Sequence, residues 1–148
     1  HIFIGNKSPK TMETFSKSIE FQVDELDDFV CHNCNKKTKM YQIYNLDTIP
    51  EIVICSFNIY SEKNRMPRYF PDKLQFPAID GKHMFRYVQV GQAEHYGTLQ
   101  SGHYTARALR VLKDNVKQVF QLNDMGVTAS AFGPSPNTYL VAYHLGDF

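Results

Sequence analysis

The sequence predicts a single, mainly β domain built on an antiparallel sheet. Apolar residues recur at every second position or in short runs, which is typical of strands. Tyrosine and phenylalanine, which favour strands, number nine and eleven in a chain of 148 residues. No long stretch shows helical periodicity. The length is that of one ordinary domain, which can bury a core without disulfides or metal.

Seven segments are predicted to be strands, and turn residues separate them. The segment 51–60 is the richest in Ile, Val and Phe and predicts a buried central strand. Short helices are expected near 26–29 or 128–132. Asp80-Gly81, residues 113–115 and residues 133–137 are turn signals, and the polar segment 61–71 with two prolines predicts an exposed loop. The predicted strands are 17–23, 40–44, 51–60, 85–90, 104–111, 116–122 and 138–144.

The charge balance excludes several classes of partner. The chain has 16 basic and 15 acidic residues, without the basic surplus that nucleic acids or anionic membranes attract. It contains no apolar run long enough to cross a bilayer and no signal-peptide pattern. An odd number of cysteines, with Cys31 and Cys34 close together, argues against a secreted disulfide framework. We therefore expect an intracellular protein, cytoplasmic or nuclear.

The segment 94–106 carries the first candidate for chemistry, His103. A Gly-His-Tyr at the start of a strand, after a loop with Gly97 and Gly102, can present an imidazole at the edge of a sheet. Histidine is a natural general base near neutral pH. Taken alone, a surface or core histidine is the simpler interpretation.

The next predicted strand, 116–122, ends in Asn123-Asp124. An amide or carboxylate at the end of a strand can accept a hydrogen bond from the Nδ1–H of a histidine and so fix its tautomer. Asn-Asp also commonly starts a turn, and on its own this second interpretation is preferred.

Cys31-His32-Asn33-Cys34 has the spacing of half a zinc site. A closed tetrahedral site needs two more ligands, and the remaining cysteine, Cys55, lies in a predicted buried strand. The sequence thus favours a zinc-free turn that keeps a remnant of such a site, and we expect no metal and no cofactor.

These segments gain weight from their order along the chain. The Cys pair is followed by Leu46 to Pro50 leading into the buried strand, then Phe76-Pro77, Gly102-His103-Tyr104, Asn123-Asp124 and a closing strand 139–144. Over 15–144 this order resembles the C-terminal half of the ubiquitin-specific proteases, a papain-like deubiquitinase family. The resemblance implies a mainly β part of an α+β papain-like cysteine protease fold. Residues 1–45 would be a finger-like segment with half a zinc-ribbon motif, 46–148 the antiparallel palm sheet, and the helical thumb is absent from this chain.

The resemblance also implies roles for individual residues. His103 would be the catalytic base, Asn123 the residue that orients it and Asp124 its polar neighbour. Segments 61–71 and 94–101 would be the loops that flank the C-terminal tail of ubiquitin or a ubiquitin-like protein. The expected partners are that protein and an N-terminal thumb segment that carries the nucleophilic cysteine, with no nucleic acid and no membrane. The substrate-binding residues would be His95, Tyr96, Gly102 and Tyr104.

Departures from the family pattern leave the activity open. The nucleophile lies in the family's thumb, and none of the three cysteines here occupies its place. Val119 also stands where the family prefers Trp. The chain is therefore expected to be a divergent member, of cellular, viral or mobile-element origin. It would be part of a protease that cleaves after the C-terminal glycine of ubiquitin, a catalytically inactive ubiquitin-binding pseudo-protease, or a viral papain-like polyprotein protease.

Overall fold

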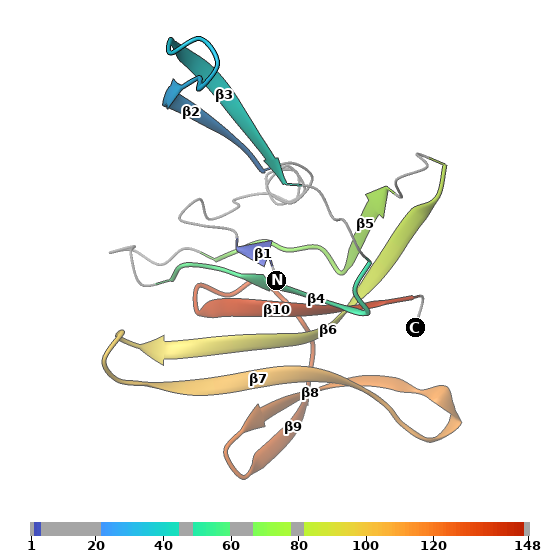
Figure 1. Cartoon of the computed structure of the whole chain (residues 1–148). Helices are drawn as coiled ribbons and strands as arrows, with labels where there is room; N and C mark the ends of the chain where they lie inside the picture. Colours follow the sequence, from blue (N-terminus) through green and yellow to red (C-terminus); the bar gives the residue numbers. More distant parts are fainter. Residues whose placement is uncertain (1, 4–21, 45–48, 60–66, 78–81, 147–148) are drawn as a thin grey trace.

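The computed structural model describes residues 2–3, 22–44, 49–59, 67–77 and 82–146. Their strands form two sheets: an eight-stranded sheet in the order β1-β4-β10-β6-β7-β8-β9 with β5 beside β6, and a two-stranded sheet of β2 and β3 (Figure 1). The strands are β1 (Ile2–Phe3), β2 (Gln22–Val30), β3 (Lys37–Tyr44), β4 (Ile52–Ser56), β5 (Lys73–Pro77), β6 (Met84–Gly97), β7 (Gly102–Val111), β8 (Lys117–Asn123), β9 (Gly126–Ser130) and β10 (Thr138–Leu145).

The prediction of a mainly β, largely antiparallel fold is confirmed. Apart from β1, which pairs with β4 in parallel, the ladders between the described strands are antiparallel. The described helical structure is one 3-10 turn, η1 (Lys113–Asn115), where Asp114 and Asn115 take the left-handed conformation that Asp and Asn tolerate. Among the described residues, no helix is long and apolar enough to span a bilayer.

Three local expectations were wrong. Residues 26–29 and 128–132 are not helical: 26–29 lie in β2, which pairs with β3, and 128–130 lie in β9, which pairs with β8, while 131–132 follow that strand. Strand β6 runs to Gly97, whereas a loop was expected from residue 94; here β10 on one edge and β7 on the other extend the ladder. Cross-strand pairing overrides local propensity in all three cases. The expected strand residues 17–21 and the Asp80-Gly81 turn lie outside the described residues.

Strand β6 organises the large sheet because it pairs with three other strands. Residues 84–88 pair with β5, residues 91–97 pair with β7, and residues 87–94 pair with β10 on the opposite edge. Its register against β10 shifts between the pairs Ala142↔Gly91 and Tyr143↔Gln89, which leaves Val90 as an extra residue. Successive side chains of a strand normally point to opposite faces of the sheet, and the extra residue in this bulge shifts that alternation by one position.

The bulge decides which side chains share a face. Gln92 pairs with Val141 and Gln89 pairs with Tyr143. Val141 and Tyr143 are two residues apart, so they point to the same face, and both glutamines point there with them. All four residues are buried. We call this face of the large sheet the core face.

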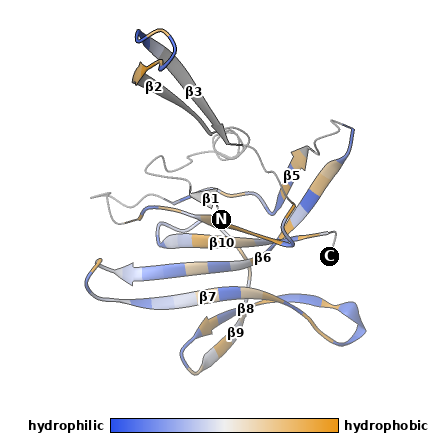
Figure 2. Cartoon of the chain, viewed as in Figure 1, coloured by the Kyte–Doolittle hydropathy of each residue, from blue (hydrophilic) through white to orange (hydrophobic). Residues whose placement is uncertain are grey.

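The apolar core covers one half of the core face, over β4, β5, β10 and the start of β6. Figure 2 shows hydrophobic residues on β4 and β5, whereas β7 is mostly hydrophilic or neutral. The hydroxyls of the buried Tyr87 and Tyr143 donate to the carbonyls of Pro50 and Pro71, at 2.7 and 2.8 Å, so neither is left without a partner. The core residues are Val53, Cys55, Phe57, Ile59, Phe70, Leu74, Phe76, Tyr87, Val141 and Tyr143.

The β2–β3 hairpin forms a sheet of its own and projects away from the large sheet (Figure 1). It lies within the segment 1–45 that is predicted to be finger-like. The large sheet contains β4 to β10, all within 46–148, together with the short strand β1. The division into finger and palm stays a prediction.

A candidate active site around His103

His103 and Asn123 lie side by side at one end of the large sheet. His103 is the second residue of β7 and Asn123 is the last residue of β8. These strands are consecutive and antiparallel, with Ala106 paired to Leu122, so the start of one meets the end of the other. The imidazole Nε2 is 2.6 Å from the Asn123 Oδ1, which is hydrogen-bond distance. The contact expected from the hairpin is therefore present.

The contacting ring nitrogen differs from the expectation. We expected Nδ1–H to donate to Asn123, but Nε2 makes the contact. Since the amide oxygen can only accept, Nε2 carries the hydrogen and Nδ1 keeps its lone pair. The His103 side chain is about half exposed, at 48%. Nδ1 is thus the nitrogen that can take a proton from a group outside the described residues.

Asp124 lies farther from the imidazole and is mostly exposed. Its Oδ2 is 3.9 Å from His103 Nε2, beyond hydrogen-bond distance. Asp124 and Met125 form the two-residue connection between β8 and β9, and Asp124 has a positive φ of 49°. Both interpretations of Asn123-Asp124 therefore hold: Asn123 contacts the histidine, and Asp124 makes the turn.

Gly102 is required by the packing behind His103. A Cβ at position 102 would overlap the His95 imidazole and the Tyr96 carbonyl oxygen. His95 is buried, pairs with Tyr104 across β6 and β7, and its ring centroid is 4.5 Å from the Tyr104 ring. Tyr104 is itself exposed and also contacts the Tyr139 ring edge-on. His95 is thus buried against Tyr104, and its expected role in substrate binding stays a prediction.

The connection between β6 and β7 is shorter than the loop expected at 94–101. Residues 98–101 form it, closed by the Thr98 amide donating to the Ser101 carbonyl at 2.8 Å. Leu99 at its tip is 71% exposed. The other expected loop, 61–71, is described from residue 67 onward.

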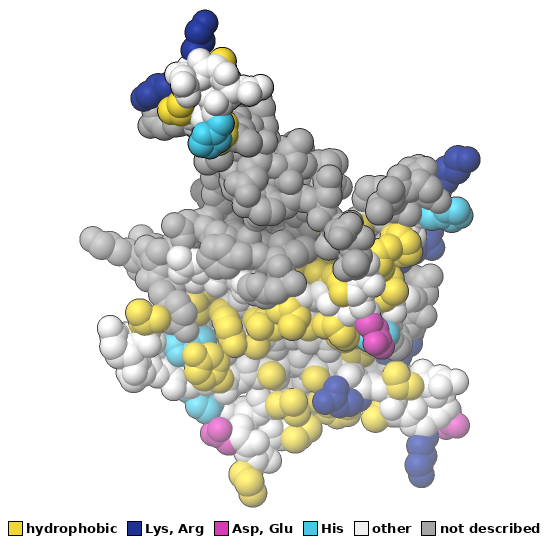
Figure 3. Space-filling model, in the orientation of Figure 1, with side chains coloured by type: hydrophobic (Ala, Val, Ile, Leu, Met, Phe, Trp, Pro, Cys, Tyr) yellow, Lys and Arg dark blue, Asp and Glu magenta, His cyan; other side chains and the backbone are white. Residues whose placement is uncertain are grey.

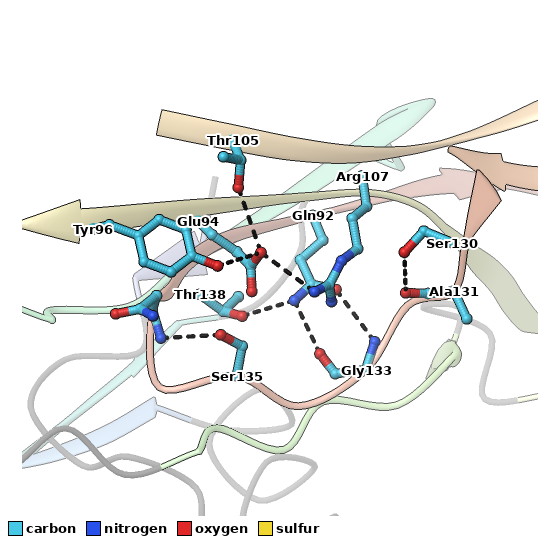
Figure 4. A network of polar contacts seen from close by, with 11 residues as sticks. Gln92, Glu94, Tyr96, Thr105, Arg107, Ser130, Ala131, Gly133, Ser135 and Thr138 are labelled. Carbon is cyan, nitrogen blue, oxygen red and sulfur yellow. Dashed lines mark hydrogen bonds and ion pairs between the residues drawn. The ribbon is translucent and has the colours of Figure 1, made fainter. Parts of the chain in front are cut away.

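Four polar side chains on the core face form a network that the sequence did not predict (Figure 4). Glu94 and Tyr96 of β6 lie across from Thr105 and His103 of β7, and Arg107 follows on the same face. The Glu94 Oε2 accepts from the Tyr96 hydroxyl at 3.3 Å and from the Thr105 hydroxyl at 3.5 Å, and is 3.4 Å from an Arg107 guanidinium nitrogen. Alternating polar residues normally predict an exposed strand face, so the pattern does not reveal this burial.

Gln92 links this polar region to the connection 131–137 between β9 and β10. Its amide nitrogen donates to the Gly133 carbonyl at 2.9 Å and to the Thr138 hydroxyl at 2.8 Å, and its oxygen accepts from the Gly133 amide at 3.3 Å. Arg68, also buried, donates to the Pro136 carbonyl at 2.8 Å. The bonds of Gln92, drawn in Figure 4, and the bond of Arg68 hold the connection onto the core face.

The surface around His103 combines polar and apolar groups. Figure 3 shows hydrophobic side chains in a band over the middle of this view, with a histidine and an acidic side chain next to each other at its lower left. Two exposed side chains lie near His103: Tyr96 across from it on β6 and Met125 beside Asp124. Tyr104, next along β7, is also exposed but points to the opposite face of the strand. Such a surface suits an extended peptide better than a compact polar ligand.

None of the three cysteines lies where it could act with His103. Cys55 pairs with Val141, which pairs with Gln92, which pairs with Arg107, so three strand spacings, about 14 Å, separate Cys55 from β7. Burial also raises the pKa of the Cys55 thiol to about 12. Cys31 and Cys34 lie at the tip of the projecting β2–β3 hairpin (Figure 1).

Cys31 and Cys34 lie together in a tight turn, each with a free thiol. The Asn35 amide donates to the Cys31 carbonyl at 2.8 Å, with Asn35 in the left-handed conformation. Hydrogen bonds from the backbone amides of Asn33 and Cys34, and from the Cys34 thiol, lower the pKa of Cys31. In the described part of the chain, no three His, Cys, Asp or Glu side chains come together as a metal site. Two thiols do not fit the four ligands of a closed zinc site.

No protein-family model matches the sequence, and no curated protein matches it. Solved structures do match. A chain of the SAGA DUB module of Ubp8, Sgf11, Sus1 and Sgf73 bound to monoubiquitin has a TM-score of 0.66 and 21% identity, over 97% of this chain and 34% of that one. The yeast SAGA DUBm with an Sgf73 mutant gives 0.68 and 20%, over 98% and 35%.

A third match is the Saccharomyces cerevisiae PAN2 pseudoubiquitin-hydrolase, with a TM-score of 0.61 and 14% identity, over 97% of this chain and 49% of that one. This chain therefore spans about a third of the SAGA chains and about half of the PAN2 chain. At these identities the likeness concerns the fold. The chain has the fold of part of a ubiquitin-specific-protease-like domain, as both an enzyme module and a pseudo-hydrolase contain it.

Proposed function

We propose that this chain is the ubiquitin-binding palm and finger part of a cysteine protease that cleaves the peptide or isopeptide bond after the C-terminal glycine of ubiquitin. The observation that carries the proposal is the 2.6 Å contact between His103 Nε2 and Asn123 Oδ1, which leaves Nδ1 as the basic nitrogen. The fold likeness to a monoubiquitin-bound SAGA DUB module supports it. The nucleophilic cysteine would lie on a thumb segment outside these 148 residues.

In this mechanism His103 takes up and gives back one proton in each of two steps while Asn123 holds the ring. Nδ1 takes the proton of the nucleophilic thiol, and the thiolate attacks the glycine carbonyl. The C–N bond then breaks, and the imidazolium gives the proton to the leaving amine. In the second step Nδ1 takes a proton from water, which attacks the thioester; the C–S bond breaks, and the imidazolium returns the proton to the leaving thiolate. Asn123 keeps Nε2 protonated throughout, so Nδ1 remains the acceptor.

Binding would use the exposed surface around His103. Tyr96 would lie beside the diglycine tail, across from His103. Tyr104, which packs on the buried His95 at the opposite face of β7, would line the tail where it passes the end of the sheet. The connection 98–101, with Leu99 exposed at its tip, would flank the tail. An intracellular location, cytoplasmic or nuclear, belongs to the same proposal.

A second function, a ubiquitin-binding module without catalysis, is favoured by one observation. No cysteine of this chain lies beside His103, and the PAN2 pseudoubiquitin-hydrolase has the same fold. The contact between His103 and Asn123 favours the enzyme, because a pure binding surface does not require an imidazole held by an amide.

The isolated chain tests both functions at once. We expect it to bind monoubiquitin in an NMR titration, with shifts concentrated on β6, β7 and their connection, and to leave a ubiquitin–fluorophore substrate uncleaved. Adding a thumb segment that carries a cysteine should start turnover if the enzyme proposal is right. Turnover by the chain alone that disappears in Cys55→Ser would overturn our assignment of the cysteines, and absence of any ubiquitin binding would refute both functions.

A further inference from the structure

The Glu94 carboxylate is completely buried among polar side chains next to His103. Its side chain is 0% exposed and that of its partner Arg107 is 19% exposed. Three groups converge on the same oxygen, Oε2: the hydroxyls of Tyr96 and Thr105 and the guanidinium of Arg107 (Figure 4). All four side chains lie on the core face, as the direct pairing of Glu94 with Thr105 and of Tyr96 with His103 requires.

A gain in stability does not explain why the Glu94–Arg107 ion pair is buried. Removing two charges from water costs more than their attraction returns unless the geometry is close to ideal, and apolar pairs of similar volume are often as stable or more stable. Here the contact is 3.4 Å, and neither Glu94 Oε1 nor Arg107 Nε has a partner among the described residues. Other strands place Val53, Leu74 and Val141 on the core face. The ion pair therefore calls for another explanation.

Tyr96 provides that explanation, because it connects the pair to the candidate site. Tyr96 is the residue directly across from His103, where the two Cβ atoms of a cross-strand pair lie about 5 Å apart. Its side chain is 41% exposed, so packing alone does not fix the ring. Its hydroxyl reaches back along β6 to Glu94 (Figure 4). Burial, followed by the charge and hydrogen bond of Glu94, raises the pKa of Tyr96, so the phenol remains a donor.

We propose that Glu94 and Arg107 are a positioning pair, which holds the Tyr96 ring beside His103 in the orientation that receives the tail of the bound protein. Arg107 orients the Glu94 carboxylate, Glu94 anchors the Tyr96 hydroxyl, and the anchored ring forms the wall of the channel across from His103. Without the anchor, the half-exposed ring samples other rotamers, including those that lean over the imidazole. This inference rests on the proposed binding of ubiquitin at this face.

The test separates positioning from stability by exchanging the ion pair for an apolar pair. In the full chain, Glu94→Leu with Arg107→Met fills the same space without charge. We expect it to melt at or above the wild-type temperature. We also expect it to bind monoubiquitin about fivefold to tenfold more weakly, the value of one ordered hydrogen bond. Tyr96→Phe removes the anchored hydroxyl alone and should give the same loss, and the triple variant should lose no more.

Two readouts are independent of ubiquitin. In Glu94→Gln, which removes the charge that raises the pKa of Tyr96 and keeps Arg107, the Tyr96 phenol should titrate at lower pH than in the wild type. In the Leu/Met variant, NMR should show increased motion of the Tyr96 ring. A matched control is Glu51→Gln, which alters the exposed ion pair of Glu51 with His144 at 3.2 Å, away from His103, and should change neither readout nor affinity.

The outcomes are distinguishable. A well-folded Leu/Met variant with wild-type ubiquitin affinity and an unaltered Tyr96 ring would show that the pair is only structural. If the wild-type chain itself fails to bind ubiquitin, the proposed function fails, while the Tyr96 titration and ring motion still decide the positioning role. If the Leu/Met variant does not fold, Tyr96→Phe and Glu94→Gln decide it by the same ring and affinity measurements.

Discussion

The core face of the large sheet has two halves that differ in chemistry. Over β4, β5, β10 and the start of β6, the buried side chains are mostly apolar, with Gln89 a buried polar side chain among them. The phenols of Tyr87 and Tyr143 each donate to a loop carbonyl. Over the end of β6 and the start of β7, the buried residues are Gln92, Glu94 and Thr105, and they lead to the exposed His103. One continuous ladder joins the halves, and the bulge at Val90 keeps them on the same face.

This difference indicates how the molecule separates stability from function. Burial of apolar area stabilises the first half, whereas buried polar groups in the second half contribute little net stability but fix the direction of each side chain. His103 is placed at the end of the polar half, where Asn123 meets it. The following predictions test that division, from the largest expected effect to the smallest.

The largest effect is expected on catalysis and none on folding. In a form of the protein that carries the nucleophile, His103→Ala should lower kcat by about 10⁴-fold, because it removes the general base. Ubiquitin binding and melting temperature should stay close to wild type. Asn123→Ala should cost less, since an orienting residue contributes less than the base it orients. Equal loss of ubiquitin binding in both variants would instead indicate a structural role for this end of the sheet.

In the apolar half, a substitution should lower the stability of the fold, in contrast to His103→Ala, which should lower kcat and leave stability unchanged. Phe76 is buried and packs edge-on against Tyr87 at 5.6 Å between ring centroids. Phe76→Ala should lower the free energy of unfolding by about 3–5 kcal/mol through lost burial and the cavity it leaves. Val127→Ala, at a 62% exposed position on β9, is the control and should change it by less than about 0.5 kcal/mol. Chemical denaturation measures both, and similar losses would refute the placement of the core.

Gly102→Ala tests the close packing of β7 against β6 next to His103. The new methyl group would overlap the His95 imidazole and the Tyr96 carbonyl, so β6 and β7 must separate locally. We expect a loss of about 1–3 kcal/mol in unfolding free energy, as for other overpacked positions, with NMR shifts centred on Tyr104. Gly133→Ala is the matched control, because a Cβ there meets nothing within 4 Å. A loss at position 133 as large as at 102 would contradict this reasoning.

The smallest expected effect is a difference in the rate at which the cysteines of the native chain are chemically labelled. The lowered pKa of Cys31 gives it more thiolate near neutral pH than an ordinary cysteine, so it should alkylate readily. Cys55, with its pKa raised to about 12 and no exposed surface, should stay unlabelled until the chain unfolds. Mass spectrometry after brief treatment with iodoacetamide at pH 7 measures the difference. Labelling of native Cys55 at the rate of Cys31 would show that the apolar half opens easily.

The sequence predicted the elements that have strong local signals. Period-two patterning located β7, β8 and β10 to within about two residues, and Lys113 to Asn115 forms the expected turn. The contact between His103 and Asn123 followed from one further step, that consecutive strands with a short connection form a hairpin. Strand β9 and the helices expected at 26–29 and 128–132 were misjudged because pairing partners, not local propensity, decide short segments.

The catalytic assignment of His103, Asn123 and Asp124 remains a prediction, as does the division into finger and palm. The roles of Tyr96, Gly102 and Tyr104 in substrate binding also stay predictions. The role of His95 stays a prediction too; the structure adds that its ring is buried next to Gly102, which cannot be read from a His-Tyr pair in the sequence.

By itself, the sequence determined the mainly β class, the strand that ends at Asn123 and the residues that meet at His103, because alternation and chain order are local properties. Only the tertiary structure decided that Nε2 faces Asn123, that Val90 is a bulge, and that Glu94 is buried with Arg107. The physical reason is that a face of a sheet becomes buried or exposed through what packs on it, and a one-residue shift in pairing reverses every side chain beyond it.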